Sequence, residues 1–253
     1  MGIKIGWCPG GPLIQCDNTK NGIDALDKFR EAILEENIFN LRCKPYMEDI
    51  EKNQILFSKI PKSKNLFISS KSNIINIVRS NDFLQQVKKK HRYYIKQSEK
   101  SKIDWQVCSG SDTARIFNIV YDEMKNTKNL KLPIINIDNF SKILGLTKDG
   151  EPRLFVYAGF ENDRPVSVCL VSLMDNKAFY HYAASTERGR DISASYGMIF
   201  NLVEKLRELS IDELDFGGLS NDGSSSGVDF FKQGFNGQGF LKIGEFDISK
   251  FKL

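Results

Sequence analysis

The sequence lacks the features of a membrane-spanning, secreted or metal-centred protein. None of its apolar runs approaches the ~20 residues that span a bilayer, and the opening MGIKIGWCPGGP has no apolar secretory core. The five cysteines are scattered and form no CxxC or Cys/His cluster, which argues against a disulfide framework and a structural zinc site. The two histidines, His91 and His181, are too few for a multi-histidine metal site. We therefore expect a globular protein of the reducing cytoplasm that holds no metal.

Proline and glycine are also scarce, with 7 and 19 residues in a chain of 253, which excludes linker-dominated and collagen-like chains. Hydrophobic residues make up 41%, enough to bury the core of one large domain or two modest ones. The net charge of +4 is not diagnostic, but lysine and arginine concentrate in residues 88–100, KKKHRYYIKQSEK. Such a run either attracts the phosphates of a nucleotide, an RNA or a lipid headgroup, or is a solvated helix face.

The first hundred residues mix strand-like and helical patterns. GWCPGGPL predicts a short strand broken by a Pro-Gly-Gly-Pro turn, and apolar spacing predicts a helix over residues 22–37. Two β-rich runs begin at Leu66 and Ile74. Residues 80–82 offer N-cap chemistry for a helix that runs into the basic cluster. We expect these cations on its solvent side and in its C-terminal half, where they complement the helix dipole.

A second unit is expected from about Ile103, with helices near residues 116–124 and 140–144. Three alternating runs, RLFVYAGF, RPVSVCLVSL and KAFYHYAAS, are joined by polar turns and predict an antiparallel meander. The elements expected after the meander are a long helix over 193–209, a strand over 211–218, a helix-like run over 228–235 and a closing strand over 240–248.

This order predicts an α/β fold with a mixed sheet and excludes an all-parallel doubly wound sheet, whose strands would alternate with helices throughout. On the third strand of the meander, regular alternation predicts that Tyr180 and Tyr182 face one side of the sheet and His181 the other. His181 is either a general base or a packed strand histidine.

The order of elements resembles GNAT-type acyltransferase domains, which place a long helix after a meander and then a further strand. Within that superfamily the residues resemble the FemABX group, the aminoacyl-tRNA-dependent transferases that form peptidoglycan bridges and contain two GNAT-like lobes. The motifs that carry the resemblance are GWCPGGPL, KKKHRYYIKQSEK, YHYAAS from Tyr180, DFGG from Asp215 and GVDFFKQGFNGQ from Gly227. The resemblance implies a partial N-terminal GNAT-like lobe over residues 1–102, ending in the basic helix, and a complete C-terminal lobe over residues 103–253.

The activity implied by this resemblance is transfer of an aminoacyl group from charged tRNA to an amine of a cell-wall precursor or a related amino metabolite. Charged tRNA would be a co-substrate, no other cofactor would be needed, and the protein would contact the inner face of the membrane. Two alternatives stay open. One is a GNAT N-acetyltransferase that uses acetyl-coenzyme A on an amino sugar or small amine, and the other is a catalytically silent relative that binds tRNA or a nucleotide.

The resemblance also names site residues. The lysine of the family's FKxGF motif, here Lys232, would lie beside the scissile ester and stabilise the developing oxyanion, with Phe231 against the substrate. A lysine that extends its stem along an apolar surface is the structural alternative. Asp215 would accept a proton or orient the amine, or form a turn with nearby backbone N–H groups. Tyr180 is the third catalytic candidate, and Gly218 would permit close approach of the backbone.

Phosphate contacts have two candidate locations. Lys90, Arg92 and Lys96 of the basic helix would contact the phosphates of tRNA or of a diphosphate-bearing acceptor. In the acetyl-coenzyme A alternative, TERGRDISASYG would cradle a pyrophosphate at a helix N-terminus, with Arg188 and Arg190 binding a phosphate from the side. The acidic residue within that loop weakens the second location, because it would repel a pyrophosphate.

Overall fold

The computed structural model describes residues 4–14, 18–36, 38–78, 82–108, 112–138, 153–220 and 226–249. The helix predicted near residues 140–144 lies outside the described residues. The chain forms two compact units. Unit 1 comprises residues 1–72, 218–224 and 239–253, and unit 2 comprises residues 73–217 and 225–238.

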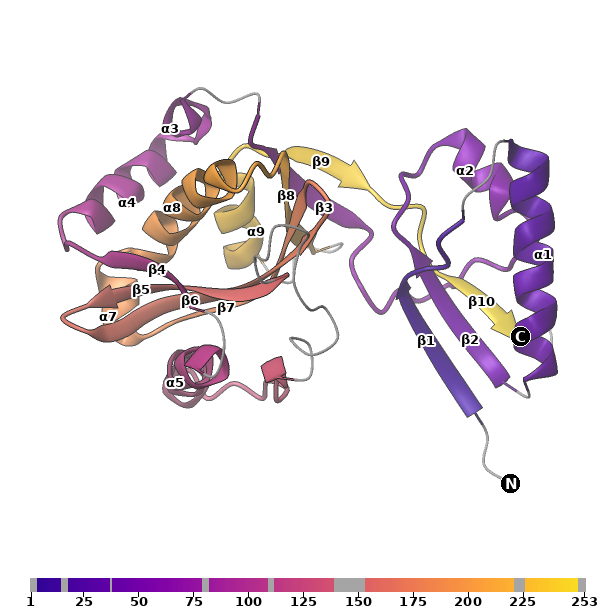
Figure 1. The fold of residues 1–253 in the computed structure, drawn as a ribbon, viewed down its shortest axis with the longest axis horizontal. Helices are drawn as coiled ribbons and strands as arrows, with labels where there is room; N and C mark the ends of the chain where they lie inside the picture. Colours follow the sequence, from indigo (N-terminus) through magenta and orange to yellow (C-terminus); the bar gives the residue numbers. More distant parts are fainter. Residues whose placement is uncertain are drawn as a thin grey trace. The chain divides into compact units, whose positions relative to one another are not determined.

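Unit 1 is built on a three-stranded sheet of order β1-β2-β10, in which β1 is parallel and β10 antiparallel to β2 (Figure 1). Alternation along β2 points Leu41 and Cys43 into the apolar core that packs against α1. Gly10 is the last residue of β1, at the turn that the sequence predicts. Its φ of +80° is a conformation that glycine adopts readily. The elements of unit 1 are β1 (Lys4–Gly10), α1 (Thr19–Glu35), β2 (Ile38–Pro45), α2 (Glu51–Leu56) and β10 (Phe246–Ser249).

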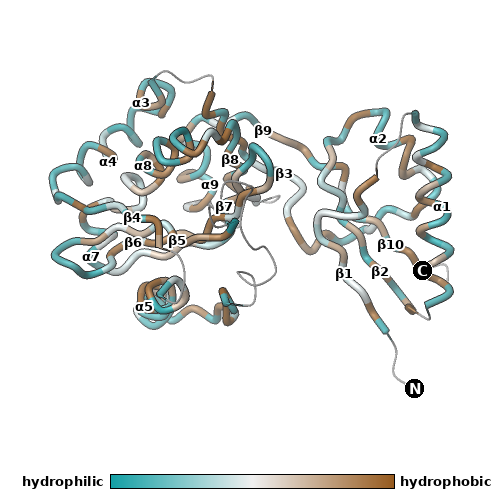
Figure 2. The backbone as a smooth tube through the Cα atoms, viewed as in Figure 1, coloured by the Kyte–Doolittle hydropathy of each residue, from teal (hydrophilic) through white to brown (hydrophobic). Residues whose placement is uncertain are grey.

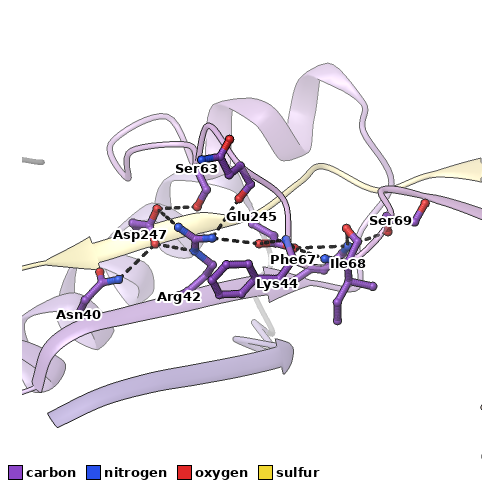
Figure 3. Close-up of polar contacts among 10 residues, drawn as sticks. Asn40, Arg42, Lys44, Ser63, Phe67, Ile68, Ser69, Glu245 and Asp247 are labelled. Atoms are coloured by element: carbon purple, nitrogen blue, oxygen red, sulfur yellow. Dashed lines mark hydrogen bonds and ion pairs between the residues drawn. The ribbon is translucent and has the colours of Figure 1, made fainter. Parts of the chain in front are cut away.

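The other residues of β2 carry a cluster of buried charges on the opposite face of this sheet (Figure 3). Arg42 binds both carboxylate oxygens of Asp247, at 2.9 and 3.1 Å. Glu245 is fully buried, 3.7 Å from Lys44 and from Arg42, and it accepts hydrogen bonds from the backbone N–H groups of Phe67 and Ile68. Paired charges therefore hold the segment around Phe67 against the sheet.

Unit 2 contains most of a seven-stranded sheet of order β4-β5-β6-β7-β8-β3-β9. Strands β4 to β7 are antiparallel neighbours, as the predicted meander requires, and β8 joins β7 in parallel. The sheet is therefore mixed and the fold is α/β, as predicted. Its strands are β3 (Lys71–Asn76), β4 (Asp104–Cys108), β5 (Leu154–Glu161), β6 (Arg164–Met174), β7 (Lys177–Ser185), β8 (Glu213–Leu219) and β9 (Gln238–Leu241).

Helices cover both faces of this sheet (Figure 1). Val168 and Leu170 of β6 belong to the core beneath α5, whereas Cys169 and Val171 belong to the core shared with α4, α8 and α9. This alternation is the period-2 signature of a strand buried on both sides. The helices of unit 2 are α3 (Phe83–Gln86), α4 (Lys89–Glu99), α5 (Asp112–Thr127), α7 (Glu187–Asp191), α8 (Ala194–Glu208) and α9 (Ser226–Gln233).

The helix expected to run into the basic cluster is in fact two helices. Asp82 caps α3 by accepting a hydrogen bond from Gln85 N, as its N-cap chemistry predicts, but Val87 then adopts an extended conformation. Helix α4 starts only at Lys89, with Lys88 at its N-cap. The first lysines of the cluster thus lie at a helix N-terminus, where the dipole opposes them, so the predicted helix-dipole explanation is wrong for them. Figure 2 shows α4 as a predominantly hydrophilic segment.

Two further expectations differ from the structure, and a third stays a prediction. The run from Leu66 is not a strand, since its backbone is held by the charges of unit 1 instead. The expected closing strand is divided into β9 and β10, with Gly244 at a φ of +111° between them. The compact units divide after Ser72 and not near residue 102, and the two GNAT-like lobes with a boundary there stay a prediction.

Within the described residues, no helix is long and apolar enough to cross a membrane. The same part of the chain contains no group of three or more histidine, cysteine or acidic side chains that could hold a metal ion.

Candidate active site

Strand β7 contains a β-bulge at His181. Val171 of β6 pairs with Tyr180 and Leu170 pairs with Tyr182, so His181 has no register partner. Tyr180 packs against the core on the α8 side, whereas Tyr182 lies opposite Leu170, which belongs to the core beneath α5. The prediction that Tyr180 and Tyr182 face the same side was wrong, because the inserted residue breaks the alternation.

Just before this bulge, β7 and β8 stop pairing. Their parallel ladder covers only residues 177–179 with residues 213–215, although both strands continue beyond it. Five residues lie around this end of the ladder and are called the β7–β8 junction below. They are Tyr180, His181, Asp215, Gly217 and Lys232.

Asp215 forms the turn that the sequence offered as one of its two roles. The side chain is 6% exposed, and its Oδ1 accepts a hydrogen bond from Gly217 N at 2.8 Å. Gly217 has a φ of +81°, which favours glycine, and this explains why glycine follows the Asp-Phe pair. Asp215 also acts on His181. Burial lowers the pKa of His181, and the negative charge of Asp215 raises it by a smaller amount.

Lys232 lies beside the same turn. A Cβ atom added to Gly217 would be 3.2 Å from Lys232 Nζ and 3.4 Å from the carbonyl oxygen of Tyr180. The structure therefore brings the ammonium group of α9 to the point where β7 and β8 separate. The positive φ favours glycine here, and a Cβ atom would also contact the ammonium group closely.

The phenylalanines around Lys232 hold helix α9 in place. Phe231 contacts Phe216 and Phe235, with ring centroids 5.7 and 5.3 Å apart. Phe235 is 1% exposed, and the amide of Asn73 donates a hydrogen bond to the carbonyl oxygen of Lys232 at 2.8 Å. Phe231, predicted to contact substrate, thus serves first to pack α9 against the sheet.

His91, which the sequence left unassigned, anchors the same helix. Its ring is 1% exposed, and its Nε2 lies 3.0 Å from the carbonyl oxygen of Phe231. Burial lowers the pKa of His91, so the neutral ring is favoured. A Cβ atom on Gly234 would fall 1.9 Å from Nε2, so only glycine fits against this ring. His91, together with Gly234 of the Phe-Lys-Gln-Gly-Phe motif, therefore holds the backbone that carries Lys232.

Tyr180 and His181 differ in environment although they are adjacent. The phenol of Tyr180 makes a T-shaped contact with Phe216 at 4.8 Å, and burial raises its pKa well above the usual value. His181 is exposed, and its Nε2 lies 2.7 Å from Oγ of Ser172. Its surroundings lower its pKa from 6.5, so the ring is neutral near pH 7.

The three cations predicted on α4 have different roles. Lys90 is exposed and lies over the ring of Phe230, 5.1 Å from its centroid. Arg92 donates a hydrogen bond to the carbonyl oxygen of Gln85 and so ties α4 to α3. Lys96 is exposed. In the described part of the chain, no carboxylate forms an ion pair with any lysine of residues 88–100.

The two arginines predicted at the alternative phosphate loop are bound within the protein. Arg188 forms a bidentate pair with Glu161 at 2.7 and 2.6 Å, and Arg190 donates to the carbonyl oxygen of Ser185. A Cβ on Gly189 would be 2.1 Å from the carbonyl oxygen of Val166, so packing against β6 accounts for this glycine. The amides that donate hydrogen bonds within this short segment are those of Gly189, Arg190, Ile192 and Ser193.

Gly218 is not grouped with the junction. It belongs to unit 1, and a Cβ atom there would lie 2.9 Å from Cβ of Ser69. The close backbone approach expected at Gly218 is therefore made to another part of the chain, and its role toward a substrate stays a prediction.

Sequence reasoning missed two residues that shape the site. Ser172 carries no motif and becomes a partner of His181 through the pairing of β6 with β7. His91 bonds to a backbone atom 140 residues away, which no local pattern can indicate.

Residues 156–253 match the model of the FemAB family. No curated protein matches the chain. Among solved structures, "Crystal structure of FemX" superposes with a TM-score of 0.78 at 16% identity, covering 96% of this chain and 80% of that one.

Two further structures share the fold. The C-terminal domain of a putative lysylphosphatidylglycerol synthetase from Agrobacterium fabrum has a TM-score of 0.63 at 12% identity, over 97% of this chain and 78% of that one. L-PGS from Bacillus licheniformis has a TM-score of 0.59 at 12% identity, over 89% of this chain and 74% of that one. Residues 156–253 thus resemble the FemAB family, and nearly the whole chain has the fold of FemX.

Proposed function

We propose that this protein is an aminoacyltransferase that moves an aminoacyl group from charged tRNA to an amine of a cell-wall precursor or a related amino metabolite. The observation that carries the proposal is the position of Lys232 beside Gly217 and the carbonyl of Tyr180, where β7 and β8 separate. The lysine of the matching motif thus reaches from α9 to the end of the β7–β8 ladder.

Lys232 supplies the group that this reaction needs most. The acceptor amine attacks the carbonyl carbon of the aminoacyl ester, and the carbonyl π electrons move onto oxygen. A cation fixed beside that oxygen stabilises the tetrahedral intermediate, which then expels the ribose oxygen of the tRNA. Removing one such stabilising group typically costs about 10²–10³ in rate. His91, Gly234 and the phenylalanines keep α9 in place, so little reorganisation is needed when charge develops.

The lysines of α4 are suited to the donor. They lie on a hydrophilic helix whose N-terminus also carries partial positive charge, and no described carboxylate neutralises them. The polyanionic backbone of tRNA is attracted by such a surface, and the affinity depends strongly on salt. Binding of the donor is therefore expected to weaken as the ionic strength rises.

The acetyl-coenzyme A alternative finds less support. Its loop would need backbone amides and arginines directed at a pyrophosphate. Four amides of residues 189–193 already donate hydrogen bonds within the segment, and Arg188 is held by Glu161. Arg190 is likewise engaged at the carbonyl of Ser185.

Thermal unfolding at low salt tests the choice of donor. The protein is melted with aminoacylated tRNA, with the same tRNA after deacylation, and with acetyl-coenzyme A. A ligand at 100 times its dissociation constant adds about 2.7 kcal/mol to the free energy of unfolding. We expect a larger shift in melting temperature with the aminoacylated tRNA than with the deacylated one. A shift with acetyl-coenzyme A and none with tRNA would establish the acetyltransferase instead.

A further inference from the structure

Strand β7 carries an imidazole at the junction, that of His181, which lies on the face of the sheet shared by Ser172 and Phe179. In a regular strand His181 would face away from both of its neighbours. It has no register partner, and its ring reaches Ser172, whose own register partner is Phe179. Bulges are over-represented next to active sites.

The hydrogen bond with Ser172 engages Nε2 of the ring. Nε2 lies 2.7 Å from Oγ of Ser172, and that serine is only 9% exposed. When Nε2–H donates to this oxygen, the lone pair of the neutral ring is on Nδ1. His181 as a residue is exposed, so a ligand can reach it.

The electrostatic surroundings keep this ring neutral and ready to accept a proton. The groups that act on it from neighbouring strands are Ser172 on β6 and the carboxylate of Asp215 on β8. Desolvation lowers the pKa of His181 and Asp215 partly offsets this, so an imidazolium formed during the reaction would be stabilised by the nearby carboxylate.

His181 also follows directly, in the chain, a residue whose backbone lies beside the cation that would bind the oxyanion. Its neighbour Tyr180 provides the carbonyl oxygen that lies, with Lys232 Nζ, around Gly217. A cation for the developing oxyanion and a neutral base for the amine therefore meet at one junction. Acyl transfer to an amine requires both groups.

We propose that His181 takes the proton from the acceptor amine during aminoacyl transfer, through Nδ1, with Ser172 as its positioning residue. This role rests on the proposed function. The amine nitrogen forms a bond to the ester carbon, and its proton moves to Nδ1 of His181. The intermediate then collapses, the bond to the ribose oxygen breaks, and that oxygen takes the proton from the imidazolium. The proton count balances, and no other reactant is needed.

The test uses the full chain in single-turnover transfer from tRNA charged with labelled amino acids. The acceptor probe is a soluble cell-wall precursor peptide with a free lysine amine. The wild-type protein is compared with H181Q, with S172A and S172T, and with Y182F as a matched neighbour. Thermal melts confirm that each variant folds. Each variant must also bind charged tRNA with the same affinity as the wild-type protein.

We expect H181Q to lose about 100-fold or more in transfer rate, the usual contribution of a general base. Protonation of the acceptor amine changes the rates of the wild-type protein and of H181Q equally, so it cancels in the ratio of the two rates. This ratio should fall about tenfold per pH unit below the pKa of His181, which lies under 6.5. A further variant, H181A, should regain part of its activity when imidazole is added. S172A should lose about 10-fold, S172T should retain more activity than S172A because it keeps a hydroxyl, and Y182F should stay close to wild type.

The outcomes separate the two proposals. If the wild-type protein transfers and H181Q transfers within about 2-fold of it with the same pH profile, the role of His181 is overturned and the proposed function stands. If the wild-type protein transfers from no charged tRNA, the proposed function itself is overturned, and the role of His181 with it.

Discussion

The two units use cations in opposite ways. In unit 1, Lys44 is buried and Arg42 is partly buried, and both are matched by Glu245 and Asp247, which also receive hydrogen bonds from backbone or side-chain groups (Figure 3). In unit 2, the exposed lysines of α4 form no ion pair with any described carboxylate.

This difference separates charges that build the fold from charges that are available to a ligand. A buried cation must be neutralised where it lies, because desolvation is costly. An exposed cation is solvated and can exchange its counterions for the phosphates of a polyanion. The comparison predicts that mutations in the first set change stability, whereas those in the second set change binding.

The largest effect on stability is expected at Glu245. E245Q removes the charge that faces Lys44 and leaves a buried ammonium without its carboxylate, so we expect a loss of about 3–5 kcal/mol in the free energy of unfolding. Urea denaturation measures this loss. The control is D27N, which removes the ion pair of Asp27 with Lys59 on the surface and should cost at most about 1 kcal/mol. Equal losses in the two variants would contradict the distinction between buried and exposed pairs.

Lys232 is expected to affect chemistry and not stability. K232M should reduce the single-turnover rate of aminoacyl transfer by about 10²–10³, because the oxyanion loses its cation. K232R keeps the charge and should retain more activity than K232M. The melting temperature of both variants should stay within about 2 °C of wild type, since Met and Arg both keep the apolar stem of this half-buried side chain. A K232M variant that transfers at the wild-type rate would exclude this residue from the reaction.

The burial of Lys44 predicts a pH dependence of stability. Desolvation lowers its pKa from 10.5 to about 8 in the folded protein, so the unfolded chain binds more protons between these values. The free energy of unfolding should therefore increase as the pH rises from 8 to 10.5, by up to about 3 kcal/mol. Denaturation across this range should show the slope in wild type and a smaller slope in K44M. The same slope in both proteins would show that Lys44 does not cause it.

The α4 lysines should change only the affinity for tRNA. Replacing Lys89, Lys90 and Lys96 with glutamine should weaken binding and lower the slope of log K against log salt by about 2, because each phosphate contact contributes about 0.7–0.9. A control with the same change in net charge replaces three exposed lysines of unit 1. These control positions are Lys20, Lys28 and Lys52. If both triple variants bind alike, net charge and not the α4 surface determines the affinity.

Local patterns in the sequence predict much of this fold. The meander, the long helix α8 and the N-cap at Asp82 depend on residues within a few positions of one another. The break at Val87 was not predictable, because the apolar pattern continues through it. The bulge at His181 is a property of the register between β6 and β7, which neither strand specifies alone.

The site was predicted where a motif marks it and missed where distant contacts create it. Lys232 and Asp215 stand in recognisable motifs and do lie together at the junction. The roles of His91 and Ser172 arise from partners on other elements. The carboxylates that neutralise Arg42 and Lys44 are about 200 residues away in the chain, so no sequence pattern distinguishes these buried cations from the exposed ones.

The most direct test of the central claim is transfer itself. Wild-type protein is incubated with a precursor peptide that carries a free lysine amine, and either with tRNA charged with labelled amino acids or with labelled acetyl-coenzyme A. We predict that label passes from the charged tRNA to the peptide and that K232M greatly slows this step, with no transfer of acetyl groups. Acetylation of the peptide without any transfer from tRNA would contradict the account.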